Sequence, residues 1–210
     1  MRKNGFTLAE IMVALSIVAV IATISAPLIS SILPDRNKVM FLKAYKVLGD
    51  ITQELVNDSA FYIDGEECEG LNCVSLPIHE DFQDEIYSGD NKFSYLLAAK
   101  MNTIDDPENN NGTVTFQSTD GIQWSSVKTE NGYEVTVDFN RDAGPNATYN
   151  ENPERQDRFT FAVDRRGNIT PVDYLSQAYL RNPHKLNDRQ NDYATAKSLV
   201  PVEEPELPEE

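Results

Sequence analysis

One loop of this 210-residue chain carries oxygen-bearing side chains at a spacing that suits a hard cation. Asp138, Asn140 and Asp142 alternate with other residues, and a backbone that curls over such a stretch can wrap their oxygens around Ca²⁺. The match to an EF-hand loop is incomplete, because Ala143 separates Asp142 from Gly144 and no Glu stands at the twelfth position. The alternative interpretation is an Asx-rich turn without an ion.

The two cysteines, Cys68 and Cys73, bracket a short loop. Two cysteines without a nearby histidine supply too few ligands for zinc, and redox-active pairs are usually two residues apart. In an oxidising compartment the pair would form a structural disulfide, worth about 2 kcal/mol in the chain-entropy model. We therefore predict a disulfide between Cys68 and Cys73.

The sequence shows no catalytic constellation. The histidines, His79 and His184, lie in polar stretches, and no serine stands in a Gly-x-Ser-x-Gly motif. The net charge is −16, from 18 basic and 34 acidic residues, and it would repel phosphate backbones and anionic lipid headgroups. These features argue against a nucleic-acid binder and a peripheral membrane protein, and we predict that the chain is not an enzyme.

The N-terminal end is apolar, although the mean hydropathy of the whole chain is −0.45. From Ile11 to Leu33 no residue is charged, and a helix of this length crosses a hydrocarbon core of about 30 Å. Arg2 and Lys3 precede this run and predict a cytoplasmic N-terminus, with the rest of the chain across the membrane. The alternative, a cleavable secretory signal, is shorter and has no reason to contain Pro27.

Glu10 stands at the edge of the apolar run, where an ionisable group usually has a partner. Alternatively, it only begins the helix, where a negative charge suits the helix dipole. The segment from Lys3 to Glu10, KNGFTLAE, followed by an apolar helix that contains Pro27, resembles the N-terminus of type IV pilins and of the pilin-like subunits of type II secretion systems.

This resemblance implies a maturation pathway and an assembly role. Prepilin peptidase would cut between Gly5 and Phe6, and the new N-terminus of Phe6 would be methylated. Glu10 of an incoming subunit would pair with the Phe6 amine of a neighbour in a filament. Pro27 would be the place where the helix bends or partly melts on assembly.

The stretch from Asp138 to Val163 resembles a C-terminal pattern of pilin-like proteins, in which acidic residues flank a loop before a late strand. Several secretion pseudopilins bind calcium in such a loop. Here Arg141 stands where the pattern usually has glycine, and residues 147–156 look like an insertion. The calcium ligands that the resemblance implies are Asp138, Asn140, Asp142 and Asp157. We expect no other cofactor.

The apolar periodicity after Pro34 predicts that one long helix runs from about Phe6 to about Ser59, open to interruption at Pro27 and Pro34. A short helix is predicted at residues 93–101. Alternating, β-branched and aromatic residues predict strands at 113–117, 122–128, 133–138 and 159–164, with Asn131-Gly132 as a hairpin turn.

The predicted fold class is α+β, with a long N-terminal helix packed on an antiparallel β-sheet, an architecture that resembles the pilins. The first half of the helix would be transmembrane and the second half amphipathic. The predicted divisions are a leader peptide (1–5), a transmembrane and assembly helix (6–33), a periplasmic or extracellular α+β domain (34–182) with its helix to about residue 59 and its sheet at about 113–172, and an acidic flexible tail (183–210).

The resemblance implies a structural filament subunit that polymerises into a type II secretion pseudopilus or a type IV pilus. The expected partners are prepilin peptidase, other pilin-like subunits, an inner-membrane assembly platform and the membrane, with no nucleic acid. The expected location is the bacterial inner membrane, with a single pass, a cytoplasmic N-terminus and a periplasmic domain, and then the filament.

Two alternatives remain open. The first is a minor pilin that binds surfaces or takes up DNA; however, the mature chain would carry 16 basic and 34 acidic residues, a net charge of −18, which disfavours DNA. The second is a signal-anchored secreted enzyme, which would need a pocket with converging catalytic groups.

Overall fold

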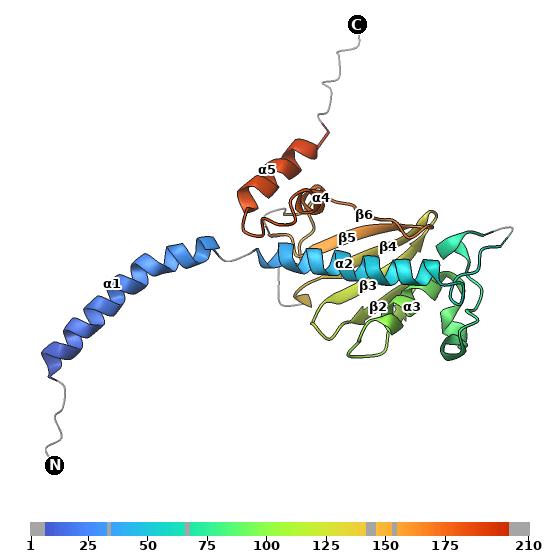
Figure 1. The fold of residues 1–210 in the computed structure, drawn as a ribbon, viewed down its shortest axis with the longest axis horizontal. Helices are drawn as coiled ribbons and strands as arrows, with labels where there is room; N and C mark the ends of the chain where they lie inside the picture. Colours follow the sequence, from blue (N-terminus) through green and yellow to red (C-terminus); the bar gives the residue numbers. More distant parts are fainter. Residues whose placement is uncertain (1–6, 33–34, 66–67, 142–145, 153–154, 202–210) are drawn as a thin grey trace, which may run out of the picture.

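The computed structural model describes residues 7–32, 35–65, 68–141, 146–152 and 155–201, with the side chains of residues 24–32 left undescribed. Figure 1 shows an α+β architecture in which helices accompany one antiparallel sheet. This confirms the predicted α+β fold class, because the described chain has an N-terminal helical part, a six-stranded antiparallel sheet and C-terminal helices.

The helix predicted from about residue 6 to about residue 59 is divided into two, and the division falls between Ile32 and Arg36, around Pro34, one of the two places where the sequence left an interruption open. Helix α1 spans Leu8–Ile32 and continues through Pro27, and helix α2 spans Arg36–Asn57. Asp35 begins α2 as an N-cap, because its Oδ1 accepts a hydrogen bond from the backbone N–H of Asn37 at 3.1 Å. A new cap means a new helix start, and residues 33–34 lie outside the described residues.

The sheet is a simple meander in which each strand pairs with the next along the chain, in the order β1-β2-β3-β4-β5-β6. All pairs are antiparallel. The strands are β1 (Glu108–Asn110), β2 (Thr113–Gln117), β3 (Gln123–Thr129), β4 (Gly132–Asp138), β5 (Arg158–Asp164) and β6 (Ile169–Pro171). Four of them lie where the residue pattern predicted strands.

The β3–β4 hairpin turns one residue earlier than predicted. Thr129 pairs with Gly132, so the two-residue loop is Glu130-Asn131, and Gly132 belongs to the strand. Gly132 has a φ of 143°, and a Cβ at this position would collide with the carbonyl oxygen of Val163 on β5. Glycine is therefore needed here for the close approach of β5 as well as for the turn.

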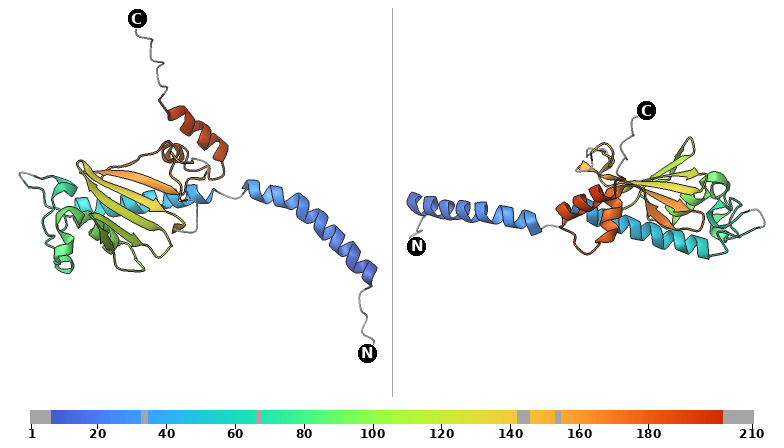
Figure 2. Two further views of the ribbon diagram at one scale, coloured as in Figure 1. Left: turned by 180° about the vertical axis from the view of Figure 1, so that it is seen from behind. Right: turned by 90° about the horizontal axis from the view of Figure 1, so that it is seen from above.

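Helix α2 lies along one face of the sheet (Figures 1 and 2). Phe41 stands on α2 with its ring centroid 5.3 Å from those of Phe159 and Phe161 on β5. Leu48 and Leu55 continue the same buried stripe along α2. The amphipathic pattern of the sequence is thus explained by burial against the sheet, the main source of the domain's stability.

Shorter helices complete the domain. Helix α3 (Lys92–Lys100) lies where a short helix was predicted, and it follows four 3-10 turns, η1 (Gly70–Asn72), η2 (Glu80–Phe82), η3 (Glu85–Tyr87) and η4 (Gly89–Asn91). Helices α4 (Tyr174–Arg181) and α5 (Arg189–Leu199) follow the sheet.

Helix α5 corrects the prediction of a flexible tail from residue 183. Its Asp192 and Ala196 are buried, because α5 packs beside α4 and the start of α2 (Figure 1). The polar composition of residues 183–201 concealed a helix whose few inward side chains make specific contacts. Residues 202–210 of the predicted tail lie outside the described residues.

Candidate functional site

The start of α1 is organised by a reciprocal pair of hydrogen bonds between Thr7 and Glu10. The Glu10 carboxylate accepts from the backbone N–H and the hydroxyl of Thr7, both at 2.8 Å, and the backbone N–H of Glu10 donates to Thr7 Oγ1 at 3.3 Å. This is a capping box, in which the carboxylate satisfies N–H groups that a helix start leaves open. Glu10 is therefore held at the N-terminal end of α1.

The structure describes little of the other residues predicted for processing and assembly, which are Gly5, Phe6 and Pro27. Gly5 and Phe6 lie outside the described residues, and Pro27 lies within α1 with its side chain outside them. The described apolar side chains of α1 are exposed, from Leu8 to Ile21. No helix in the described part of the chain is both long and apolar enough to cross a membrane. The predicted span from Ile11 to Leu33 ends in residues whose side chains lie outside that part.

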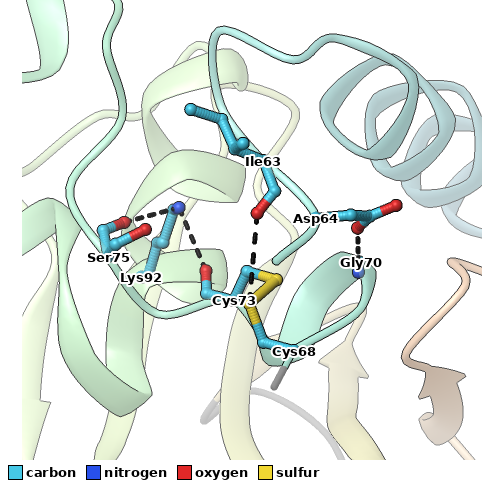
Figure 3. Close-up of a disulfide and its surroundings, with 7 residues drawn as sticks. All are labelled: Ile63, Asp64, Cys68, Gly70, Cys73, Ser75 and Lys92. Carbon is cyan, nitrogen blue, oxygen red and sulfur yellow. Dashed lines mark hydrogen bonds between the residues drawn. A yellow bond between two sulfur atoms is a disulfide. The ribbon is translucent and has the colours of Figure 1, made fainter. Parts of the chain in front are cut away.

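The predicted disulfide between Cys68 and Cys73 is confirmed (Figure 3). The two Cα atoms lie 5.1 Å apart, within the usual range for a disulfide. Asp64, which precedes the loop between the two cysteines, also contacts it, because its Oδ1 accepts a hydrogen bond of 2.7 Å from the backbone N–H of Gly70. The bridge thus closes a small structural loop that follows α2.

The disulfide loop rests on the turn between β5 and β6. The backbone N–H of Leu71 donates to the carbonyl oxygen of Arg165 at 2.8 Å, and Glu69 forms ion pairs with Arg165 and Arg166. Gly70 has a φ of 55°, and a Cβ there would collide with the Arg165 carbonyl oxygen. The loop therefore joins two regions that are almost a hundred residues apart in the sequence.

Lys92 binds the chain at the Cys73 end of the disulfide loop. The sequence analysis did not single out this residue. Its ammonium donates to the carbonyl oxygens of Cys73 at 3.1 Å and Ser75 at 2.6 Å (Figure 3). It also lies 4.2 Å from the ring centroid of Tyr62. The side chain is buried, and this burial lowers the pKa of Lys92 to about 8. No sequence pattern marks this lysine, because the chain around it reads as an ordinary helix start.

The start of α2 contains a second buried lysine that sequence analysis missed. Lys38 forms an ion pair of 2.6 Å with Asp192 of α5, and their side chains are 0% and 2% exposed. The same ammonium donates to the carbonyl oxygen of Lys185 at 3.1 Å. Burial raises the pKa of Asp192, while the charge and hydrogen bond of Lys38 act in the opposite direction.

Asp35 makes further contacts between the start of α2 and the C-terminal segment. Its carboxylate pairs with Arg189 at 3.2 Å and accepts a hydrogen bond from the Tyr179 hydroxyl at 3.3 Å, and its backbone N–H donates to the carbonyl oxygen of Leu186. The C-terminal segment thus holds the first turn of α2, immediately after the position where α1 and α2 are divided.

Three of the four predicted calcium ligands come together at the open end of β4 and β5. Asp138 ends β4, Asn140 follows it, and Asp157 directly precedes β5. The Asn140 side-chain N–H donates to Asp157 Oδ2 at 2.9 Å. The fourth predicted ligand, Asp142, lies outside the described residues.

The two carboxylates of this loop already accept hydrogen bonds at every oxygen. Asp138 Oδ1 accepts from the backbone N–H groups of Asn140 and Arg141, and its Oδ2 accepts from Arg158 Nε. Asp157 Oδ1 accepts from the Ala147 N–H, and its Oδ2 accepts from Asn140 and from a second N–H that Asn146 supplies. Each of the two carboxylates is thus an anion that is held by N–H donors of the protein.

Asp138, Asn140 and Asp157 are therefore engaged by donors of the protein itself, whereas the predicted calcium set as a whole stays a prediction, because Asp142 lies outside the described residues. Among the residues that the structure describes, no group of three or more His, Cys, Asp or Glu side chains is placed to hold a metal ion. The positive charge beside Asp138 belongs to Arg158, and Asp157 is only 1% exposed. One buried acceptor of the loop, Asn140 Oδ1, has no hydrogen-bond partner among the described residues.

The His79 side chain packs against two phenylalanine rings. The His79 ring stacks on Phe61, with centroids 5.2 Å apart, and meets the edge of Phe82 at the same distance. His79 Nδ1 accepts the backbone N–H of Asp81 as the cap of η2. The ring therefore has a packing and capping role.

Comparison with protein families gives a match at the N-terminal end of the chain. Residues 1–26 match the model described as the prokaryotic N-terminal methylation motif. Comparisons with curated proteins and with solved structures find no match. The matched segment contains the predicted cleavage position and the capping box of α1.

Proposed function

We propose that this chain, a type IV pilin-like protein, is a structural filament subunit that is N-methylated and polymerises into a type II secretion pseudopilus or a type IV pilus. The match of residues 1–26 to the N-terminal methylation motif carries this proposal. The motif implies processing by prepilin peptidase and suggests anchoring in the inner membrane before assembly. Pilin-like proteins are typically non-enzymatic, so we propose a role in assembly and none in catalysis.

In this proposal the N-terminal segment supplies the assembly contacts. Cleavage between Gly5 and Phe6 leaves a charged amine on Phe6, and Glu10 of an incoming subunit pairs with that amine on a neighbour. The capping box supports this role, because Thr7 keeps the Glu10 carboxylate at the N-terminal end of α1, close in sequence to the new amine. Retention of Glu10 favours a subunit that stacks within the filament over a tip subunit.

The proposed location follows from the same segment. The uncleaved protein crosses the inner membrane once, with its N-terminus cytoplasmic and its sheet domain periplasmic. Its proposed partners are other pilin-like subunits and the inner-membrane assembly platform. The net charge of −18 on the mature chain disfavours DNA as a ligand.

The mass of the N-terminal peptide from native membranes tests the processing step. We expect a chain that begins at Phe6 and carries one added methyl group, about 14 Da. A chain that begins near Thr23 would identify an ordinary secreted protein, and an intact Met1 would identify a simple anchor. Either result would remove the basis for the proposed assembly role of Glu10.

A pair of variants tests the assembly step. Glu10→Ala should still be cleaved and methylated but should fall about tenfold or more in the sheared filament fraction, because the neighbour's amine loses its partner. Asp50→Ala, which removes an exposed carboxylate from α2, is the matched control and should assemble normally. Normal assembly of Glu10→Ala would contradict the proposal.

A further inference from the structure

The loop between β4 and β5 contains a cluster of acidic and amide side chains that the assembly proposal does not use. We infer that Arg158 takes the place of a cation beside Asp138, so that the two described carboxylates, Asp138 and Asp157, are held by the protein's own donors and do not bind calcium. The inference concerns residues 138–141, 146–147 and 157–158, all of which the structure describes.

The position of Arg158 is fixed by the sheet. Asp138 and Arg158 are the directly opposed residues at the end of the β4–β5 ladder, where the chain leaves one strand and enters the other. The guanidinium Nε lies 2.9 Å from Asp138 Oδ2, and the Asp138 side chain is only 7% exposed. A cross-strand pair at this position places a permanent positive charge where the loop begins and ends.

The remaining oxygen of Asp138 organises the turn itself. Asp138 Oδ1 accepts the backbone N–H of Asn140 at 3.1 Å and that of Arg141 at 2.8 Å. Arg141 has a φ of 55°, a left-handed conformation that turns the chain back toward the strand. In the orientation that satisfies its hydrogen bonds, the Asn146 amide nitrogen donates to Asp138 Oδ2 at 3.1 Å and also to the Arg141 carbonyl oxygen.

Asp157 closes the other side of the loop. It accepts hydrogen bonds from Ala147 N at 2.7 Å, Asn140 Nδ2 at 2.9 Å and Asn146 N at 3.1 Å. Charge-assisted bonds of this kind to a buried carboxylate are stronger than bonds between neutral groups. The two carboxylates together meet seven N–H donors, so a Ca²⁺ ion would have to displace several of them in order to gain its oxygen ligands.

The calcium arm of the test uses the full chain in detergent micelles. The thermal unfolding midpoint is measured in excess chelator and in about 10 mM CaCl₂, well above the dissociation constants of weak extracellular calcium sites. We expect the two midpoints to agree within about 1 °C. A rise of several degrees with Ca²⁺ but not with Mg²⁺ would overturn the inference, because binding to the folded state raises its stability.

The charge arm uses Arg158→Gln, with Arg155→Gln as a matched control in the same loop, where Arg155 is exposed. We expect Arg158→Gln to lower the midpoint by about 4 °C or more and Arg155→Gln to change it by less than about 1 °C. Arg158→Lys, which keeps the charge, should recover part of the loss. Equal midpoints for the two glutamine variants would overturn the inference, and the calcium arm stands even if Arg158→Gln fails to fold.

Discussion

Lys38 and Asp192 form an ion pair from which water is almost fully excluded. Removal of one partner leaves the other charge buried and unpaired, so we expect Lys38→Met to cost about 3–5 kcal/mol of unfolding free energy. Apolar residues in place of both partners, as in Lys38→Met with Asp192→Leu, should recover most of this loss. Urea unfolding of the single and double variants measures the coupling.

The matched control for this pair lies on the same helix. Lys43 pairs with Asp120 at the same distance of 2.6 Å, but its side chain is 51% exposed. Lys43→Met should therefore cost less than about 1 kcal/mol. If Lys38→Met cost no more than Lys43→Met, the C-terminal segment would not hold the start of α2 in solution.

Lys92 predicts a dependence of stability on pH. Its pKa is lowered by burial from 10.5 to about 8, so between these values the unfolded chain binds more protons than the folded one. The Lys92 contribution to stability must then rise with pH, by about 2 kcal/mol between pH 7.5 and 9.5. Urea unfolding across this range measures it. Lys92→Met should remove the rise, and an unchanged slope in that variant would assign the dependence to other groups.

At the scale of elements, the disulfide loop and the β5–β6 turn form one unit. Gly70→Ala would drive a Cβ into the Arg165 carbonyl oxygen, so we expect a loss of about 3 kcal/mol or more. Gly89 also has a left-handed φ, of 70°, but a Cβ there meets nothing within 4 Å. Gly89→Ala should cost only about 1 kcal/mol. If urea unfolding gave the same loss of unfolding free energy for Gly70→Ala and Gly89→Ala, the left-handed backbone conformation and not the collision with the Arg165 carbonyl oxygen would account for the loss.

The elements with a strong local pattern were predictable from the sequence. Helix α3 and strands β2 to β5 follow from apolar period and β-branched content, and the pairing of Cys68 with Cys73 follows from the compartment and the number of cysteines. The exposed strand β1 and helix α5 were missed, because their residues are mostly polar and their stability comes from neighbours. The division between α1 and α2 depends on the Asp35 cap, a local signal present in the sequence.

The candidate site was also predictable only in part from the sequence. Sequence spacing brought Asp138 and Asn140 to attention, the resemblance added Asp157, and the structure places the three together. Their use as acceptors for N–H donors was not predictable, because Arg158 acts through the register of two strands. Likewise, the partner of Lys38 is 154 residues away in the sequence, beyond the reach of any local pattern.

At the scale of the whole molecule, charge and apolar surface are unevenly divided. Residues 58–108 contain 13 acidic residues and only two basic ones, Lys92 and Lys100. Lys92 is buried and Lys100 pairs with Glu54, so neither offsets the acidic surface of this segment as a free cation. The described side chains of α1, in contrast, are apolar apart from Glu10, Ser16 and Thr23, and they are exposed.

Association of such molecules must balance the burial of α1 against repulsion between the acidic domains. Repulsion between exposed charges falls as salt shortens the screening length from about 30 Å at 0.01 M to about 10 Å at 0.1 M. The free energy gained by burying apolar helices does not decrease over this range of salt concentration. We therefore expect self-association of the full chain in detergent, measured by analytical ultracentrifugation, to strengthen by about tenfold or more between these salt concentrations. An uncharged osmolyte at equal osmolality should leave it unchanged. Association that instead weakened with salt would mean that ion pairs between subunits outweigh the repulsion, and the acidic segment would then be a contact surface.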